Sequence, residues 1–140
     1  SLDLSGSFLA NETHLSDLFD TNIRKGKWGG DAGLNYFLTR HIGIGGDIEM
    51  SDNGGNFVDA VVGSLILRLP LEPTGLAPYV MGGGGRSTDR TWEWLAHLGV
   101  GLEFRFNPTL GLFTDGRYIW HDKEGSTDKL LLRAGLRFVF

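Results

Sequence analysis

The chain has 140 residues with 22 glycines, four tryptophans and no cysteine, a length that supports a single hydrophobic core. Its formal net charge is −4 and its basic residues are scattered, which argues against nucleic acid as a partner. The lack of cysteine excludes disulfide scaffolds and thiol catalysis. We expect no signal peptide, and no apolar run approaches the roughly 20 residues that a membrane-spanning helix needs.

Apolar and polar residues alternate with period two along the chain, and no segment has the spacing of a helix. The alternation predicts eight strands, at residues 2–10, 26–38, 41–50, 57–69, 76–85, 92–106, 110–120 and 129–140. It is weakest in the fourth and fifth strands, where Asp59 falls among apolar positions and residues 81–85 have no readable face. A bulge in either strand could shift the register there.

The predicted connections alternate in length along the chain. Short turns at 39–41, 70–75 and 107–109 alternate with mostly longer, polar segments at 11–25, 51–56, 86–91 and 121–128. An even strand number with turns at one end and loops at the other is typical of outer-membrane barrels. The predicted fold class is therefore all-β, an eight-stranded antiparallel up-and-down transmembrane β-barrel that forms one domain over residues 1–140.

The two faces of the predicted strands differ in bulk. One face carries Trp, Phe, Leu and Ile at most positions of six strands, whereas the other holds glycines and charged residues. The interior of an eight-stranded barrel is only wide enough for side chains to fill. The bulky face is therefore expected to point outward toward lipid, which disfavours a soluble ligand-binding barrel with an apolar interior.

The inward face is expected to hold a charge network of seven acidic and seven basic residues together with one histidine. Its members are Asp3, Lys27, Asp31, Asp47, Glu49, Arg68, Glu93, His97, Glu103, Arg105, Asp115, Arg117, Lys129, Arg133 and Arg137. Isolated charges in a narrow lumen are costly, so these groups should form ion pairs and plug the barrel. Strand order makes Asp3 and Asp115 the nearest partners of the two arginines on the last strand. A narrow gated pore is the alternative.

Aromatic residues on the outward face are expected to form two belts at the edges of the hydrocarbon layer. The belt residues are Trp28, Trp92, Trp94, Tyr118 and Trp120 at the loop end, and Tyr36, Phe104 and Phe106 at the turn end, where Phe138 and Phe140 also lie.

Four segments, at 33–36, 77–80, 116–118 and 134–140, resemble small eight-stranded outer-membrane barrels of Gram-negative bacteria, the group of the OmpA transmembrane domain, OmpX and Ail. The resemblance covers the whole chain. It implies an outer-membrane location with both termini periplasmic, and contact with outer-membrane lipid and lipopolysaccharide. It also implies that the barrel assembly machinery reads Phe138 and Phe140 during insertion.

The resemblance says little about activity, and the residues favour no enzyme. None of the four histidines has a second histidine or a cysteine at metal-ligand spacing, so no metal or other cofactor is expected. His121 lies near the position where a lipid A deacylase family of similar barrels carries its catalytic histidine. That family needs a serine two residues later, where this chain has Lys123. A lipid A-modifying enzyme is therefore a less favoured alternative.

The first long connection, 11–25, contains four apolar residues among charged ones: Leu15, Leu18, Phe19 and Ile23. Exposed apolar clusters often mark contacts, so these residues are expected either to dock a protein partner or to pack over the barrel mouth. The expected role is structural or interaction-based.

Overall fold

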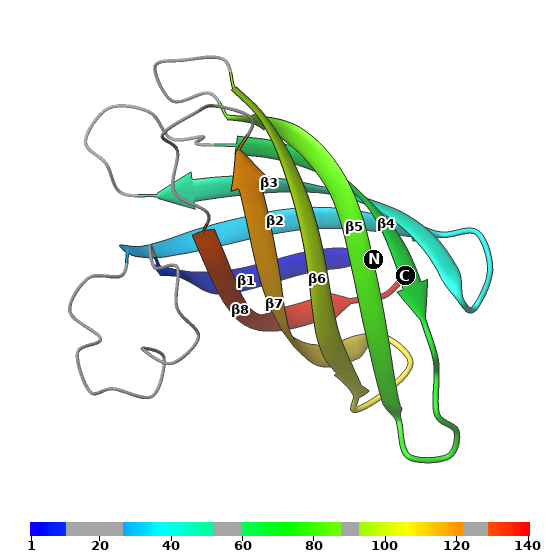
Figure 1. Cartoon of the computed structure of the whole chain (residues 1–140). Helices are drawn as coiled ribbons and strands as arrows, with labels where there is room; N and C mark the ends of the chain where they lie inside the picture. Colours follow the sequence, from blue (N-terminus) through cyan, green and yellow to red (C-terminus); the bar gives the residue numbers. More distant parts are fainter. Residues whose placement is uncertain (11–26, 52–59, 88–92, 122–128) are drawn as a thin grey trace, which may run out of the picture.

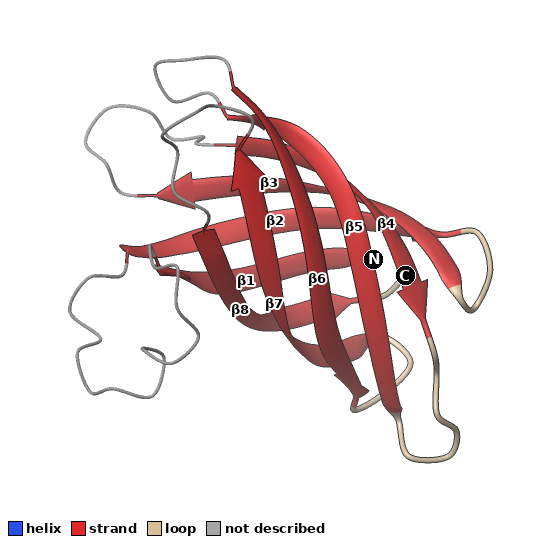
Figure 2. Cartoon of the chain, in the orientation of Figure 1, coloured by secondary structure: helices blue, strands red, loops and turns tan. Residues whose placement is uncertain are grey.

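The protein is an all-antiparallel barrel, described by a computed structural model for residues 1–10, 27–51, 60–87, 93–121 and 129–140. Its strands are β1 (Leu2–Ala10), β2 (Lys27–Phe37), β3 (Ile42–Ser51), β4 (Ala60–Arg68), β5 (Leu76–Ser87), β6 (Glu93–Arg105), β7 (Leu110–His121) and β8 (Lys129–Phe138). Each strand pairs with the next in sequence, and β1 pairs with β8 to close the barrel (Figures 1 and 2). The predicted fold class is confirmed. In the part of the chain that the structure describes, no helix is long and apolar enough to cross a membrane.

The strands match the predicted segments to within a few residues, with differences at two strand ends. β5 continues through its glycines to Ser87, and β8 ends at Phe138, so Phe140 lies beyond the last paired residue. The register of β4 with β5 runs without interruption from Ala60 opposite Ser87 to Arg68 opposite Tyr79. The register shift that the sequence left open is therefore absent from the described part of this pair, and Asp59 lies outside it.

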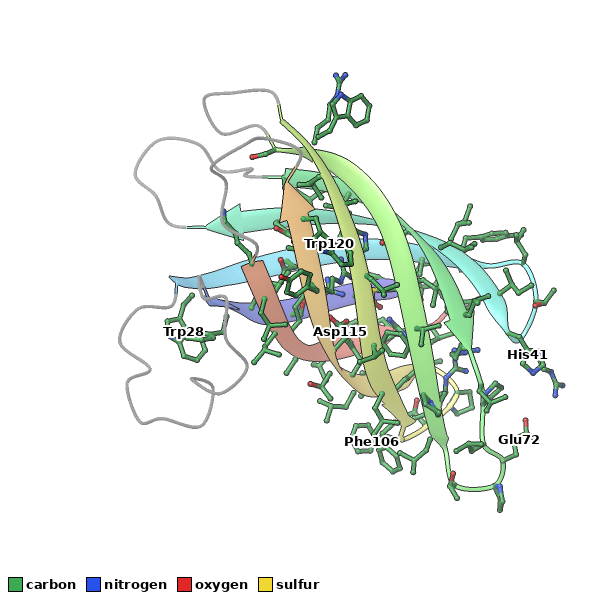
Figure 3. All side chains as sticks on the ribbon, in the orientation of Figure 1. Trp28, His41, Glu72, Phe106, Asp115 and Trp120 are labelled. Carbon is green, nitrogen blue, oxygen red and sulfur yellow. The ribbon has the colours of Figure 1, made fainter. Side chains whose placement is uncertain are left out.

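The three short turns gather at one end of the barrel, called the turn end here, and the opposite end is called the loop end. Asn107 Oδ1 closes one turn by accepting hydrogen bonds from the backbone N–H groups of Thr109 (2.9 Å) and Leu110 (2.7 Å). Gly75, which adopts φ of 72°, occupies the turn between β4 and β5. Figure 3 shows Glu72 and Phe106 at the turn end and Trp28 at the other, with Asp115 between them.

Side-chain burial alternates along the strands, as the sequence predicts. Leu98, Leu132 and Trp94 are exposed on the outer face, whereas Asp115 and Arg133 are buried inside. The interior is not exclusively polar, however. Two clusters of buried apolar residues also face the lumen. The interior of an eight-stranded barrel is narrow enough for such side chains to fill it.

Inward-facing glycines leave room for polar side chains of the neighbouring strand. A Cβ atom on Gly33 would overlap Asp47 Oδ1, and a Cβ on Gly101 would come within 2.7 Å of Asp115 Cβ. Both carboxylates belong to the lumen network. The glycine positions therefore set the space in which the charged groups lie.

Replacing Gly33 with alanine is expected to lower the free energy of unfolding by about 1 to 3 kcal/mol, because Asp47 must move in a close-packed interior. Urea titration of protein refolded into lipid vesicles measures the change. Gly6→Ala is the matched control, since a Cβ at outward-facing Gly6 meets nothing within 4 Å. Equal effects of the two substitutions would contradict the crowding argument.

Candidate functional site

The lumen contains a first group of ion pairs near the turn end, centred on Arg137 of β8. Its guanidinium donates to both oxygens of Asp3, from Nε at 2.8 Å and from Nη2 at 2.6 Å, and its Nη1 donates to Glu103 at 2.5 Å. Glu103 also accepts from Arg105 at 2.6 Å and from Arg68 at 3.3 Å. Three guanidinium groups therefore share one fully buried carboxylate.

A second group lies one step farther from the turns and is centred on Arg133. Arg133 donates to both oxygens of Asp115, at 2.9 and 2.7 Å, and to Asp47 at 3.3 Å. Arg117 binds Asp47 at 2.9 Å and lies 3.6 Å from Asp115. All four side chains are buried, and each has an oppositely charged partner within 4.0 Å, while Nε and Nη1 of Arg117 have no hydrogen-bond partner.

Aromatic and amide side chains connect and complete these groups. The Phe113 ring lies between the two central arginines, with Arg137 5.1 Å and Arg133 5.7 Å from its centroid. Tyr79 donates its hydroxyl to Asp115 at 2.9 Å, and Asn35 donates to Asp3 at 2.7 Å. Two strands that are not neighbours, β5 and β7, are thus linked across the lumen by the bond from Tyr79.

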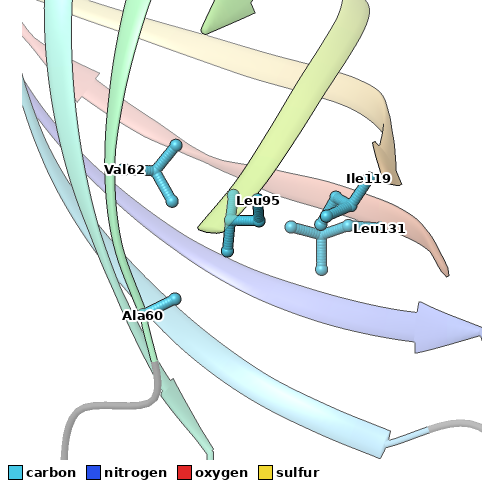
Figure 4. Packing of buried hydrophobic residues seen from close by; sticks show 5 residues of the cluster. All are labelled: Ala60, Val62, Leu95, Ile119 and Leu131. Atoms are coloured by element: carbon cyan, nitrogen blue, oxygen red, sulfur yellow. The ribbon is translucent and has the colours of Figure 1, made fainter. Parts of the chain in front are cut away.

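A layer of apolar side chains, shown in Figure 4, lies on the loop-end side of the second group. It comprises Ala60, Val62, Leu95, Ile119 and Leu131. On four strands an apolar residue stands one inward position nearer to the loop end than a polar one: Val62 above Ser64, Leu95 above His97, Ile119 above Arg117 and Leu131 above Arg133. The described part of the lumen therefore contains both ion pairs and a layer of apolar side chains.

The structure brings together most of the charged residues that the sequence assigns to the lumen. The residues in described lumenal ion pairs are Asp3, Asp47, Arg68, Glu103, Arg105, Asp115, Arg117, Arg133 and Arg137. Asp31, Glu49 and Lys129 form no ion pair within 4.0 Å among the described residues. The side chains of Lys27 and Glu93 lie outside the described part. Arg133 and Arg137 do reach Asp115 and Asp3, as the strand order predicts.

His97 hydrogen-bonds to Ser64 rather than to a carboxylate, with 3.2 Å between Nε2 and the serine Oγ. A serine beside a histidine resembles the start of a nucleophile–base pair. However, both side chains are buried in the lumen, and His97 Nδ1 has no hydrogen-bond partner that could orient the ring. We therefore interpret this hydrogen bond as structural, since it joins two buried polar side chains in the interior.

The described residues bear on the expectations about metal and enzyme sites only in part. Within the described ranges, no group of three or more His, Cys, Asp or Glu side chains has an arrangement that could hold a metal ion. The side chain of His121 lies outside the described residues, as does Lys123.

The predicted belt residues that are described all lie on the outer face. Trp28, Trp94, Tyr118 and Trp120 are exposed near the loop end, and Tyr36, Phe104, Phe106, Phe138 and Phe140 near the turn end. Edge-to-face ring pairs join Phe104 to Phe106 and Tyr118 to Trp120. Trp92 falls outside the described residues, as do Leu15, Leu18, Phe19 and Ile23 of the first connection.

Sequence reasoning missed several uncharged members of the lumen. Asn35, Ser64, Tyr79 and Phe113 are all buried inside. Strand parity could have placed them there, because Asn35 shares its face with Asp31 and Phe113 shares its face with Asp115. A search for charge alone overlooked them.

Comparison with known proteins gives matches in structure but not in sequence. No family model matches the chain, and neither does any curated protein. The N-terminal β-barrel domain of Pseudomonas aeruginosa OprF has a TM-score of 0.69 at 15% identity, over 99% of this chain and 96% of that one. Neisserial surface protein A has a TM-score of 0.64 at 12% identity, over 99% and 94%. The chain has the fold of small outer-membrane barrels.

A third match, Ail of Yersinia pestis, was solved in complex with a heparin analogue. Its TM-score is 0.58 at 12% identity, and the alignment covers 99% of this chain and 95% of Ail. These three proteins and this chain share the closed eight-stranded barrel. At these identities the likeness establishes the fold and leaves the activity to be argued from the side chains.

Proposed function

We propose that this chain is an integral outer-membrane protein with a structural or surface-interaction role. Large apolar side chains such as Leu98, Val100 and Leu132 are exposed on the outer face. Exposing them to water would be unfavourable, whereas exposing them to lipid would not. The structural matches to outer-membrane barrels support the same location. We further propose that the turn end and both termini face the periplasm and that the long connections face outward.

The lumen is proposed to be a plug rather than a pore. The observation that carries this proposal is the pairing of all five described lumenal arginines with buried carboxylates. An ion that crossed the barrel would have to separate these pairs, in a lumen that is also partly filled by the apolar layer at Leu95 and Ile119. Separating buried ion pairs in a narrow interior is costly.

Planar-bilayer recording tests the plug. The unmodified protein is expected to give negligible or only brief currents, and Glu103→Gln should give the same result, because the Arg133 group and the apolar layer remain in place. Stable, ion-selective unitary currents from the unmodified protein would contradict the plug.

A narrow gated pore is the second candidate, and the shared carboxylate favours it. Glu103 is bound by Arg68, Arg105 and Arg137, so one partner can leave while two remain. If such exchange opens a path, Glu103→Gln should change the open probability of currents that the unmodified protein already shows. The same recordings therefore separate the two candidates.

An enzymatic role is not proposed. The Ser64–His97 pair is buried in the lumen, and His97 Nδ1 has no hydrogen-bond partner that could orient the ring. For partners, we propose outer-membrane lipid and lipopolysaccharide around the belts, the assembly machinery at Phe138 and Phe140, and a protein partner at the outer connections.

A further inference from the structure

The arginines of the Arg133 group are too few to neutralise both the carboxylates of the group and those that lie next to it. Asp47 and Asp115 take up the two guanidinium groups of Arg117 and Arg133. Two more acids, Asp31 and Glu49, stand on the same inner wall at the next positions on β2 and β3. Among the described side chains of this group, the carboxylates therefore outnumber the guanidinium groups by two, on the side of the lumen formed by β1, β2 and β3.

Asp31 and Glu49 lie directly opposite each other on paired strands. Side chains in such cross-strand pairs have Cβ atoms about 5 Å apart, and like charges there are destabilising. Asp31 is only 6% exposed, and its Oδ1 is buried without a hydrogen-bond partner. An unpaired buried carboxylate oxygen beside a second carboxylate points to a cation between them.

Further oxygen atoms stand beside this pair. Ser5 Oγ donates to Asp31 Oδ2 at 3.3 Å, and Ser7 Oγ lies 3.0 Å from the place that a Cβ on Gly29 would occupy. Gly29 is the next inward position on β2 toward the loop end, so the Ser7 hydroxyl lies just above Asp31. The donors are two carboxylates and hydroxyls, which are the ligands of hard cations.

Among the described residues, the apolar layer is supplied by β4, β6, β7 and β8 and not by β1, β2 or β3. The next inward positions toward the loop end from Ser5 and Asp31 are Ser7 on β1 and Gly29 on β2. Glu49 stands level with Asp31 in the strand pairing and is half-buried, while Asp31 is buried.

We propose that Asp31 and Glu49, together with the Ser7 hydroxyl, bind one divalent cation of the calcium type in the loop-end half of the lumen. A charge of +2 neutralises the two surplus carboxylates. Calcium accepts irregular sets of six to eight oxygen ligands, so water completes the coordination. Two carboxylates make a weak site, with a dissociation constant of about 10⁻⁴ to 10⁻³ M.

Calorimetric titration of the detergent-solubilised chain with CaCl₂, at constant ionic strength after treatment with EDTA, tests this site. Saturable binding of about one Ca²⁺ per chain is expected. Asp31→Asn and Glu49→Gln should each weaken binding about tenfold or more. Glu72→Gln, at an exposed carboxylate in the turn end, is the matched control and should leave binding unchanged.

Thermal unfolding provides a second readout that does not depend on the heat of binding. In EDTA, Asp31→Asn should melt at or above the temperature of the unmodified protein, because the substitution removes one of two facing charges. With Ca²⁺ added, only the unmodified protein and the Glu72→Gln control should gain stability. Absence of Ca²⁺ binding by the unmodified protein, or binding that survives both lumenal substitutions, would overturn the proposal. Bilayer conductance plays no part in this test, so its outcome is separate from that of the plug.

Discussion

Replacing Arg133 with alanine is expected to lower the free energy of unfolding by about 3 to 5 kcal/mol. The guanidinium makes two hydrogen bonds to Asp115 and one to Asp47, and all three side chains are buried. Without this guanidinium, the remaining partners of Asp115 are the Tyr79 hydroxyl at 2.9 Å and Arg117 Nε at 3.6 Å. Equilibrium unfolding by urea in lipid vesicles measures the change.

Two further variants identify the cause of this loss. The double substitution Arg133→Ala and Asp115→Ala should recover part of the stability, because no unpaired carboxylate is left in the lumen. Arg40→Ala removes an arginine from an exposed pair with Glu72, 3.7 Å apart, and should cost at most about 1 kcal/mol. If Arg133→Ala were as mild as Arg40→Ala, the lumen would be well hydrated and the plug proposal would fail.

Placing arginine at Leu98 is expected to cost about 2 to 4 kcal/mol, the range for a cation near the middle of the bilayer on the outer face of a barrel. Leu98 lies near the centre of β6 and is 57% exposed, so its side chain would enter lipid. The same vesicle assay reports the cost. Leu132→Arg on β8 should behave similarly, since Leu132 also faces outward.

The matched control for this pair is Leu38→Arg. Leu38 is 63% exposed and follows the end of β2 at the turn end, where an arginine can reach water. A cost near zero is expected there. Similar costs at Leu38 and Leu98 would contradict the assignment of a lipid-facing band across the middle of the strands.

The strand pattern of this chain is readable from the sequence because each strand has one apolar face and one face of glycine and charge. In β6 and β8 the alternation persists for ten residues or more, and the burial of the side chains in the structure follows it. Short turns also make successive strands neighbours. For this reason the pairing of Arg133 with Asp115, and of Arg137 with Asp3, could be predicted: β8 lies between β7 and β1.

Contacts across the lumen were decided only by the tertiary structure. Tyr79 on β5 meets Asp115 on β7, Arg68 on β4 meets Glu103 on β6, and Arg133 on β8 meets Asp47 on β3. None of these pairs lies on neighbouring strands. Their meeting depends on the stagger and tilt with which eight strands close, and strand periodicity does not encode that stagger.

The apolar layer has the same origin. Leu95, Ile119 and Leu131 each occupy an inward position on their own strand, and strand parity alone places each of them inside. They form one layer on the loop-end side of the Arg133 group because the strand tilt places these residues of β4, β6, β7 and β8 at the same level along the barrel axis. Sequence alternation therefore determined which side chains enter the lumen, and barrel closure decided which of them meet, because meeting requires both a common face and a common height.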